Sequence, residues 1–551
     1  MSDAAITLTD IAAAEKLVGV RYSPAEREQM VSNLEGQIAS AVARRKVRLG
    51  NDEPMASRFD PRLPGFRPPA APGRVRLSER APGPLPDSAE DIAFAPVTRL
   101  SRWIAAGALT SRRLTEIYLE RIARLGPMLE CFATVTPELA LAEADAADAL
   151  TSAGVNLGPL HGIPYGLKDL FETRGIVTGW GAEPFAERVP GRDAAIVRRL
   201  RAAGAVMLGK TTVGALAYND IWYGGVTRNP WNLNEGSSGS SAGSGAATAA
   251  GLCAFGIGTE TLGSITSPCQ RNGTTGLRPT FGRVSRAGGM ALCWSLDKVG
   301  PICRSVEDTA IVTSVLNGHD ADDRSSIEMP FHFDAQRAIE GLRVGYLPEA
   351  FGEGATEVDH AALAALRELP VEVVEARLPE LPYGSLINIL YAEAAAAFEA
   401  LTLEDTDDTL TWQDEGAWPN TFRKARFLSA VDHVQLDRLR YRVMAALDDL
   451  FSEVDALIGP FSTGPMLVAS NFTGHPCLHL RAGFLDIGTR SKASLGSGKL
   501  STGEASEGPT FSVPQGISLW GRLFDEGPIL NLGMALEARL GVADRRPTFA
   551  K

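Results

Sequence analysis

The 551-residue chain lacks three features that mark common classes of protein: long apolar runs, an excess of positive charge and paired cysteines. No stretch approaches about 18 consecutive apolar residues, so we expect no membrane-spanning segment. The N-terminal sequence MSDAAITLTDIAAAEKLVG has no basic region before an apolar core, and so it does not resemble a secretory signal. A net charge of −12 without lysine- or arginine-rich blocks argues against direct binding of nucleic acid.

Cysteine and histidine are few and scattered, which bears on metal sites and on the cell compartment. None of the six cysteines has the CxxC spacing of a zinc site, and nothing indicates a disulfide framework. We therefore expect reduced thiols in a cytoplasmic protein. The seven histidines form no HExxH motif, and the closest pair, His475 and His479, lacks an acidic partner. We expect neither a metal nor another cofactor.

The chain divides into three parts by composition. Residues 1–50 are predicted to be a helical segment, because SPAE (Ser23–Glu26) combines a capping box with proline at the first helical position. Residues 51–96 contain ten prolines and are predicted to form an extended connector over the main body, without regular hydrogen-bonded structure. In residues 97–551, helical patterns alternate with short apolar runs such as AVMLG and DALIGP, which predicts an α/β domain.

The stretch GAVMLGKT (Gly204–Thr211) matches the spacing of a phosphate-binding loop, GxxxxGK[ST]. In such a loop the variable residues follow a strand and turn their N–H groups toward phosphate. Here these residues are apolar and form the predicted strand itself, after the helical sequence RDAAIVRRLRAAG. We therefore predict that Lys210 is a surface residue at the end of a strand and not part of a nucleotide site.

Two stretches rich in glycine and serine contain the candidate nucleophiles: EGSSGSSAGSGAATAAG (Glu235–Gly251) and GTETLGSITSP (Gly258–Pro268). GSSAG in the first stretch matches the GxSxG motif, which would make Ser241 a nucleophile between a strand and a helix. The helix is predicted in SGAATAAGLCA, but the preceding TRNPWNLNEGSS is polar and broken by proline. A serine–histidine–acid hydrolase therefore stays the weaker alternative.

The order of several sequence blocks resembles the amidase signature family. The blocks cover roughly residues 98–545 and are GPLHGIPYGLKDLF (Gly158–Phe171), NPWN (Asn229–Asn232), GSSAGSGAATAAGL (Gly239–Leu252), GTETLGSITSP, GLRPTFGRVSRAG (Gly276–Gly288), NFTGHP (Asn471–Pro476) and GISLWGRLFDEGPILNLGMALE (Gly516–Glu537). The resemblance implies the amidase signature fold, which has a central mixed β-sheet covered by helices; here it would carry an N-terminal helical extension. It also implies hydrolysis of a carboxamide C–N bond.

In that family a Ser-Ser-Lys triad performs the reaction, and each member has a counterpart here. The resemblance places the base at Lys168, the relaying serine with its unusual cis peptide at Ser240, and the nucleophile at Ser264. Ser241 would be an accessory hydrogen-bonding residue. The implied oxyanion hole consists of the backbone N–H groups of Thr261, Leu262, Gly263 and Ser264.

The chemistry of lysine gives a second reason, separate from the resemblance, to expect a lysine as the base. A serine hydroxyl is a weak nucleophile unless a base removes its proton, and neither glycine-serine stretch contains a histidine. An unperturbed lysine, with a pKa of about 10.4, serves as a base only when burial lowers that pKa, typically to about 7–8. Lys168 follows the apolar sequence IPYGL, which favours burial. By itself, Lys168 would instead be interpreted as an ion-pair partner of Asp169.

Five positions depart from the family pattern, two of them, Ser238 and Ala242, at glycines of the glycine-serine motif; they bear on the substrate preference and not on the reaction class. Leu262 stands where glycine is usual in the oxyanion turn, and a positive φ there would be costly. Glu260 replaces an aspartate. Thr266 replaces an arginine two residues past the nucleophile, so we expect the ion pair behind the site to be missing.

The sequence leaves the substrate and the assembly open. Four aromatic residues near these blocks either line an acyl pocket or belong to the core: Trp180, Tyr218, Trp222 and Tyr223. We favour an independent hydrolase of small linear amides, and a homodimer is one open form. One alternative is an amidase-type subunit of a glutamine-dependent tRNA amidotransferase, which would need a partner protein. The other is a non-catalytic scaffold, against which the intact triad argues.

Overall fold

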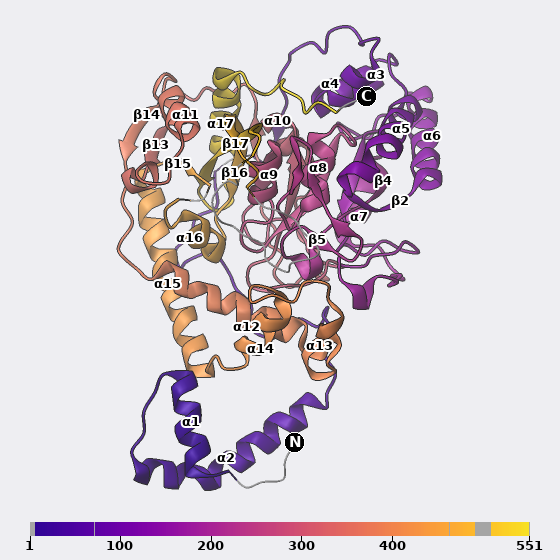
Figure 1. The fold of residues 1–551 in the computed structure, drawn as a ribbon. Coiled ribbons are helices and arrows are strands. Elements are labelled where there is room, and N and C mark those ends of the chain that lie inside the picture. The colour runs from indigo at the N-terminus through magenta and orange to yellow at the C-terminus, as the bar shows by residue number, and fades with distance from the viewer. Residues whose placement is uncertain (1–5, 71, 462, 491–507, 550–551) are drawn as a thin grey trace.

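The computed structural model describes residues 6–70, 72–461, 463–490 and 508–549. A mixed sheet of 11 strands runs through the body of the molecule (Figure 1). In spatial order the strands are β14 (Glu372–Glu375), β13 (Arg343–Tyr346), β15 (Ala456–Pro460), β17 (Phe511–Gly521), β16 (Cys477–Ile487), β10 (Thr275–Arg278), β11 (Lys298–Cys303), β9 (Phe255–Glu260), β3 (Pro164–Lys168), β4 (Val206–Thr211) and β2 (Phe132–Val135). The predicted α/β architecture with a central mixed sheet is confirmed.

The sheet is mixed because parallel and antiparallel pairs occur in different parts of it. At one edge β13 pairs in parallel with β14 and β15, and at the other edge β2 pairs antiparallel with β4. β3 pairs in parallel with β4 and β9, whereas β9, β11, β10, β16, β17 and β15 pair in antiparallel fashion. The remaining strands are short: β1 (Val75–Arg76) with β12 (Phe333–Asp334), β5 (Ile221–Trp222) with β6 (Gly225–Val226), and β7 (Arg228–Asn229) with β8 (Asn232–Gly236). Every residue of β3, β4, β9 and β11 is buried. Buried parallel strands are normally apolar, so charged side chains in this region require a specific explanation.

Helices cover the sheet and account for this burial. α5, for example, is capped by Thr110, whose hydroxyl accepts from the Arg113 N–H, and its buried side includes Leu114, Ile117 and Tyr118. The helices of the main layers are α4 (Val97–Ala105), α5 (Ser111–Leu129), α6 (Pro137–Ser152), α7 (Ala195–Ala202), α8 (Ala242–Ala249), α9 (Thr266–Asn272), α10 (Val306–Leu316), α11 (Glu357–Arg367), α16 (Met466–Thr473) and α17 (Gly527–Leu540). A second group lies toward the bottom of Figure 1: α12 (Ile387–Ala397), α13 (Glu399–Leu403), α14 (Trp418–Ala425) and α15 (Ala430–Glu453).

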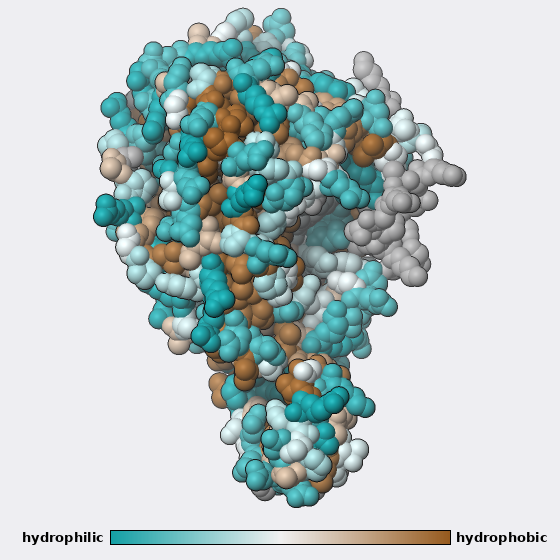
Figure 2. All heavy atoms as spheres, turned by 90° about the vertical axis from the view of Figure 1, so that its left-hand side faces the viewer, coloured by the Kyte–Doolittle hydropathy of each residue, from teal (hydrophilic) through white to brown (hydrophobic). Residues whose placement is uncertain are grey.

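The N-terminal segment forms a helical hairpin that projects from the body (Figures 1 and 2). Its helices are α1 (Leu8–Val18) and α2 (Pro24–Arg45), and the capping box predicted at Ser23 and Glu26 is confirmed. Ion pairs join the end of this segment to the body: Arg44 with Glu399 at 2.6 Å and Arg48 with Glu404 at 2.7 Å. None of the helices in the described ranges combines the length and apolarity needed to cross a bilayer.

The connector, residues 51–96, runs over the body with little regular structure, but the expectation of none was wrong. Val75–Arg76 form β1, and Ala89–Phe94 form α3. Both segments are free of proline, and the prolines stand beside them, so every backbone N–H needed for these hydrogen bonds is available.

Candidate active site

The predicted site residues meet at the centre of the sheet, where β3 and β9 end. Lys168 is the last residue of β3 and Glu260 the last of β9. Because these strands are parallel neighbours, their carboxyl ends lie at the same edge of the sheet. Ser241 caps the start of α8, and Ser264 lies in the turn between β9 and α9. One edge therefore brings together residues from three separate parts of the sequence.

Lys168 is fully buried and surrounded by oxygen atoms that bear no formal charge. Its Nζ donates to Oγ of Ser240 at 2.9 Å, to Oγ of Ser241 at 2.9 Å and to Oγ1 of Thr259 at 2.8 Å. No carboxylate among the described residues forms an ion pair with it. Burial holds the pKa of Lys168 well below its usual range, and the more distant charges of Asp297 and Glu260 oppose this only in part. The neutral amine, which can accept a proton, is therefore favoured.

The two neighbouring serines differ in what their hydroxyl hydrogens can do. Ser241 Oγ donates to the carbonyl of Ser264 at 2.5 Å, so its hydrogen is engaged. Ser240 Oγ has Lys168 as its one hydrogen-bond partner in the described part of the chain. The Ser240 hydrogen is thus available for exchange with a neutral amine. The peptide bond between Gly239 and Ser240 is cis.

The turn that follows β9 exposes a row of backbone donors. The N–H groups of Leu262, Gly263 and Ser264 have no hydrogen-bond acceptor within the described ranges. The positive φ of this turn, 88°, falls on Gly263 and not on Leu262, so the strain considered for a leucine in the turn does not arise. Thr261 is held by a hydrogen bond from its hydroxyl to Asp297 at 2.6 Å. Such a preorganised turn can stabilise an oxyanion.

Ser264 lies next to this cluster, but its hydroxyl is not in hydrogen-bond contact with Ser240. Its side chain is 9% exposed, and Oγ makes no hydrogen bond to a described residue. Ser264 is joined to the lysine cluster through its carbonyl, which accepts from both the Ser241 N–H and the Ser241 hydroxyl. Catalytic hydrogen bonds often tighten only when substrate is bound.

An ion pair lies behind Ser264, contrary to the expectation drawn from Thr266. Glu260 accepts from Arg278, on β10, at 2.7 Å and also from the backbone N–H groups of Ile265 and Thr266, each at 2.9 Å. Burial alone would raise the pKa of Glu260, but Arg278 and the Thr266 N–H outweigh it and lower that pKa to about 2. The cation comes from a different strand of the sheet, so the local motif could not reveal it.

Lys210 is fully buried, which corrects its prediction as a surface residue. Its Nζ donates to the carbonyl of Phe171 and to Thr178 Oγ1, each at 2.7 Å, and pairs with Asp169 at 3.5 Å. Burial lowers the pKa of Lys210 to about 8, against the attraction of Asp169. β4 itself covers Val206–Thr211, and α7 precedes it, as predicted. Asp169 thus pairs with Lys210 and not with Lys168.

The four predicted pocket aromatics lie among other aromatic side chains. Trp180 packs on Phe185, Tyr218 stacks on Trp412, and Trp222 contacts Tyr223. None of the four lines the cavity of about 780 Å³ that Thr259 and Thr261 border. Its other walls include connector residues 51–62, α12 and α15, which no sequence motif indicated. No cluster of three or more metal-ligating side chains occurs in the described ranges, and all six cysteines are buried and free.

Comparison with known proteins gives a family and two kinds of relative. The family model described as Amidase matches residues 113–480. The chain is 36% identical over 472 residues to a glutamyl-tRNA(Gln) amidotransferase subunit from Halorhodospira halophila, covering 79% of this chain and 95% of the relative. The corresponding protein from Pseudomonas savastanoi pv. phaseolicola is 33% identical over 467 residues, with the same coverage.

Among solved structures, native peptide amidase from Stenotrophomonas maltophilia is similar with a TM-score of 0.69 and 29% identity, covering 83% of this chain and 99% of that one. A 6-aminohexanoate cyclic dimer hydrolase complexed with substrate matches with a TM-score of 0.68 and 24% identity, covering 83% and 99%. At that lower identity the second likeness shows the fold alone.

Proposed function

Because the chain belongs to the amidase signature family and is thus an enzyme acting on C–N bonds, we propose that Ser264, Ser240 and Lys168 hydrolyse a carboxamide. The observation that carries this proposal is a buried lysine without a carboxylate partner among the described residues, hydrogen-bonded to Ser240 beside a turn of unengaged N–H groups that ends at Ser264. A base, a relay, a nucleophile and an oxyanion site are the parts that acyl transfer needs.

The proposed reaction has two halves. Ser264 Oγ attacks the carbonyl carbon while its proton passes to Ser240 and the Ser240 proton passes to neutral Lys168. The negative charge on the former carbonyl oxygen is stabilised by the N–H groups of residues 261–264. The proton returns through Ser240 to the leaving amine, the C–N bond breaks, and an ester forms on Ser264. Water, activated by the same relay, then hydrolyses the ester and releases the acid.

The substrate class follows the same line of reasoning. We propose a small linear amide, because the cavity beside the turn has the volume of a small-molecule pocket.

Free cysteines suit a cytoplasmic enzyme. Ser241 would act as an accessory that holds the Ser264 carbonyl, through its hydrogen bond of 2.5 Å.

The second candidate function is that of an amidase-type subunit within a tRNA amidotransferase. The names of the two amidotransferase relatives favour it, as does the coverage of 95% of their length. The likeness to a peptide amidase favours the first candidate, an amide hydrolase. Hydrolysis of simple amides by the purified chain without a partner separates the two, since the amidotransferase function requires other proteins for its amide-transfer reaction.

The identity of the nucleophile is tested with a phosphonyl fluoride, which reacts with an activated serine. We expect a single adduct on Ser264, mapped by peptide mass spectrometry, and slower labelling in Ser240→Ala without a change of position. An adduct on Ser241 in the wild-type protein would overturn the triad and favour the nucleophile-elbow alternative.

A further inference from the structure

The large cavity extends from the oxyanion turn to a solvent-exposed rim. Thr259 and Thr261 border it and are buried, with 9% and 5% of their surfaces exposed. Arg58 of the connector and Arg324 also border it, and both are exposed. A substrate whose amide reaches the turn after β9 therefore extends toward these arginines. This consequence rests on the proposed function.

The connector is part of the cavity wall. The Asn51 side chain donates to the Ala291 carbonyl and accepts from the Ala291 N–H, each at 2.8 Å. The Arg440 guanidinium lies 3.5 Å from the centroid of the Phe59 ring, and this ring packs in a T-shaped arrangement with Phe281, with 5.1 Å between the ring centroids. These contacts hold both ends of residues 51–59 on the body. The segment thus has a defined position from which a side chain can select substrates.

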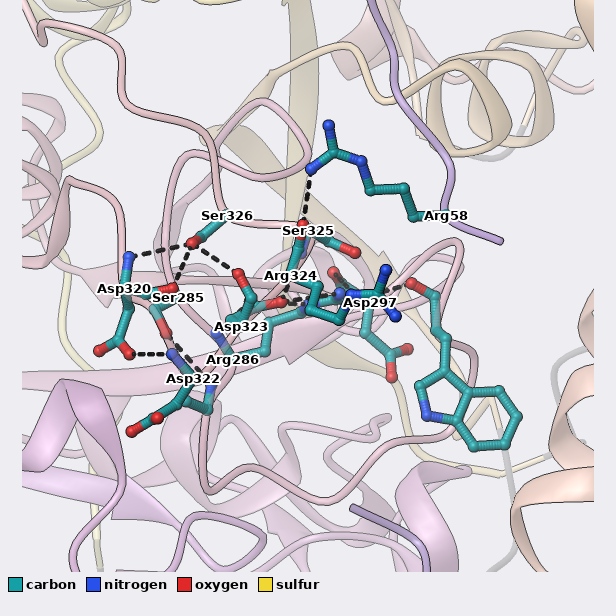
Figure 3. Close-up of polar contacts among 12 residues, drawn as sticks. Arg58, Ser285, Arg286, Asp297, Asp320, Asp322, Asp323, Arg324, Ser325 and Ser326 are labelled. Atoms are coloured by element: carbon teal, nitrogen blue, oxygen red, sulfur yellow. Dashed lines mark hydrogen bonds and ion pairs between the residues drawn. The ribbon is translucent and has the colours of Figure 1, made fainter. Parts of the chain in front are cut away.

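The opposite side of the rim is also held in place. Arg286 binds the Asp323 carboxylate at 3.3 Å and the Trp294 carbonyl at 2.7 Å. The Ser326 hydroxyl is shared among the backbone groups of residues 320 and 323 (Figure 3). These bonds fix the loop of residues 320–326 beneath Arg58, as Figure 3 shows.

Hydrogen bonds connect the connector and this loop through two arginines. Arg58 donates to the Arg324 carbonyl at 2.7 Å, and Arg324 donates to the Met55 carbonyl at 3.4 Å. Each of these hydrogen bonds uses one of the five N–H donors of a guanidinium and ends on an uncharged carbonyl oxygen. Both arginines thus lie at the same part of the rim, and neither forms an ion pair with a described acid; Asp60, the carboxylate whose pKa the Arg58 charge helps to lower, is paired with Arg62.

Most other charged side chains around the cavity are compensated. The ion pairs there are Arg62–Asp60, Arg192–Asp52, Arg198–Asp320, Arg286–Asp323 and Arg440–Asp437. Two buried carboxylates of the cavity wall, Asp297 and Glu393, form no ion pair with a described residue and accept hydrogen bonds from Thr261 and Ser295. Three exposed arginines of the rim form no ion pair with an acid among the described residues: Arg58, Arg324 and Arg438. On the same rim, Asp322 is the one exposed acid that forms no ion pair with a described residue. The rim therefore has an excess of positive charge, although the whole chain has a net charge of −12.

We propose that Arg58 and Arg324 determine specificity by binding an anionic group, such as a carboxylate, at the end of the substrate remote from the scissile amide. The planar guanidinium matches a carboxylate in two parallel hydrogen bonds, and two such groups can share one anion. The connector, which lies outside the matched residues 113–480, thereby gives this enzyme a substrate preference of its own.

The test uses two phosphonyl fluorides that differ only in the end of an alkyl chain: one ends in a carboxylate, the other in a methyl group. Each is made in several chain lengths, and the second-order rate of adduct formation on Ser264 is measured by intact-protein and peptide mass spectrometry. We expect the carboxylate probe of suitable length to react about tenfold faster, with a preference that weakens at high salt. Arg58→Gln and Arg324→Gln should each abolish most of this preference without slowing the methyl-ended probe.

The matched control is Arg67→Gln, because Arg67 is an exposed connector arginine that does not border the cavity. It should keep the full preference. Adducts that form on Ser264 at equal rates with both probes, or a preference that survives in both cavity variants, would overturn the proposed anion site while leaving the proposed function standing. Failure of every probe to label Ser264 would overturn the proposed function and this inference with it.

Discussion

The ends of β3 and β4 place two buried lysines side by side, and their surroundings differ in one respect. Lys168 is in register with Thr211, and Lys210 with Leu167 on the parallel neighbour. Both side-chain nitrogens are fully buried, and burial lowers both pKa values. Lys210 has a carboxylate partner, Asp169 at 3.5 Å, whereas the described partners of Lys168 are all hydroxyl and carbonyl oxygens.

This difference separates a structural lysine from a candidate base. A buried cation next to a carboxylate retains its charge and holds strands and loops in position. A buried amine among neutral oxygens loses its proton more readily and can accept one from a hydroxyl. Lys168 has no carboxylate ion-pair partner among the described residues, and this is therefore as informative as its hydrogen bond with Ser240.

The largest effect expected is on turnover in Lys168→Met. Methionine has a similar length but cannot accept a proton, so we expect amide turnover to fall by about four powers of ten. The thermal midpoint should stay close to that of the wild-type protein, because no buried carboxylate is left unpaired. Amide hydrolysis and calorimetry on the same preparation measure both quantities. Near wild-type turnover in this variant would refute Lys168 as the base.

The matched change Lys210→Met should reverse this pattern. Removing the cation leaves Asp169 buried beside an apolar side chain, so we expect the free energy of unfolding to fall by about 3–5 kcal/mol. Turnover per folded molecule should remain within about tenfold. Denaturant unfolding measures the loss, and the double variant Lys210→Met/Asp169→Asn should recover part of it. If Lys210→Met is as stable as the wild-type protein, the pair has no structural role.

The contrast between the lysines also shows what the sequence could predict. The helix capped by Ser23, the strand within GAVMLGKT and the α/β layers followed from local patterns and were confirmed. The burial of Lys210 was missed, because its partner Asp169 follows a different strand. The ion pair of Glu260 was missed for the same reason, since Arg278 belongs to β10. Such pairings depend on strand order, which a single sequence does not encode locally.

The pH dependence of the rate provides a third test. The pKa of Lys168 is held below its usual range by burial, and the proposed mechanism requires the neutral amine. The value of kcat/KM should therefore be low at acid pH, rise as the pH passes the lowered pKa, and level off well below the ordinary lysine value of 10.5. This rising limb of the pH profile should lie at nearly the same pH in Lys210→Met. A limb that begins only near the ordinary lysine pKa would contradict the effect of burial.

The smallest expected effect is a shift of that limb in Thr259→Val. The Thr259 hydroxyl accepts from Lys168 Nζ at 2.8 Å, and such an acceptor stabilises the ammonium form more than the amine. Valine keeps the shape of threonine but removes this acceptor, so the pKa of Lys168 should fall further. We expect the limb to move to lower pH by up to about one unit, with the plateau rate changed less than about tenfold. A kcat/KM profile of the two proteins measures the shift, and a move to higher pH would mean that Thr259 does not stabilise the charged lysine.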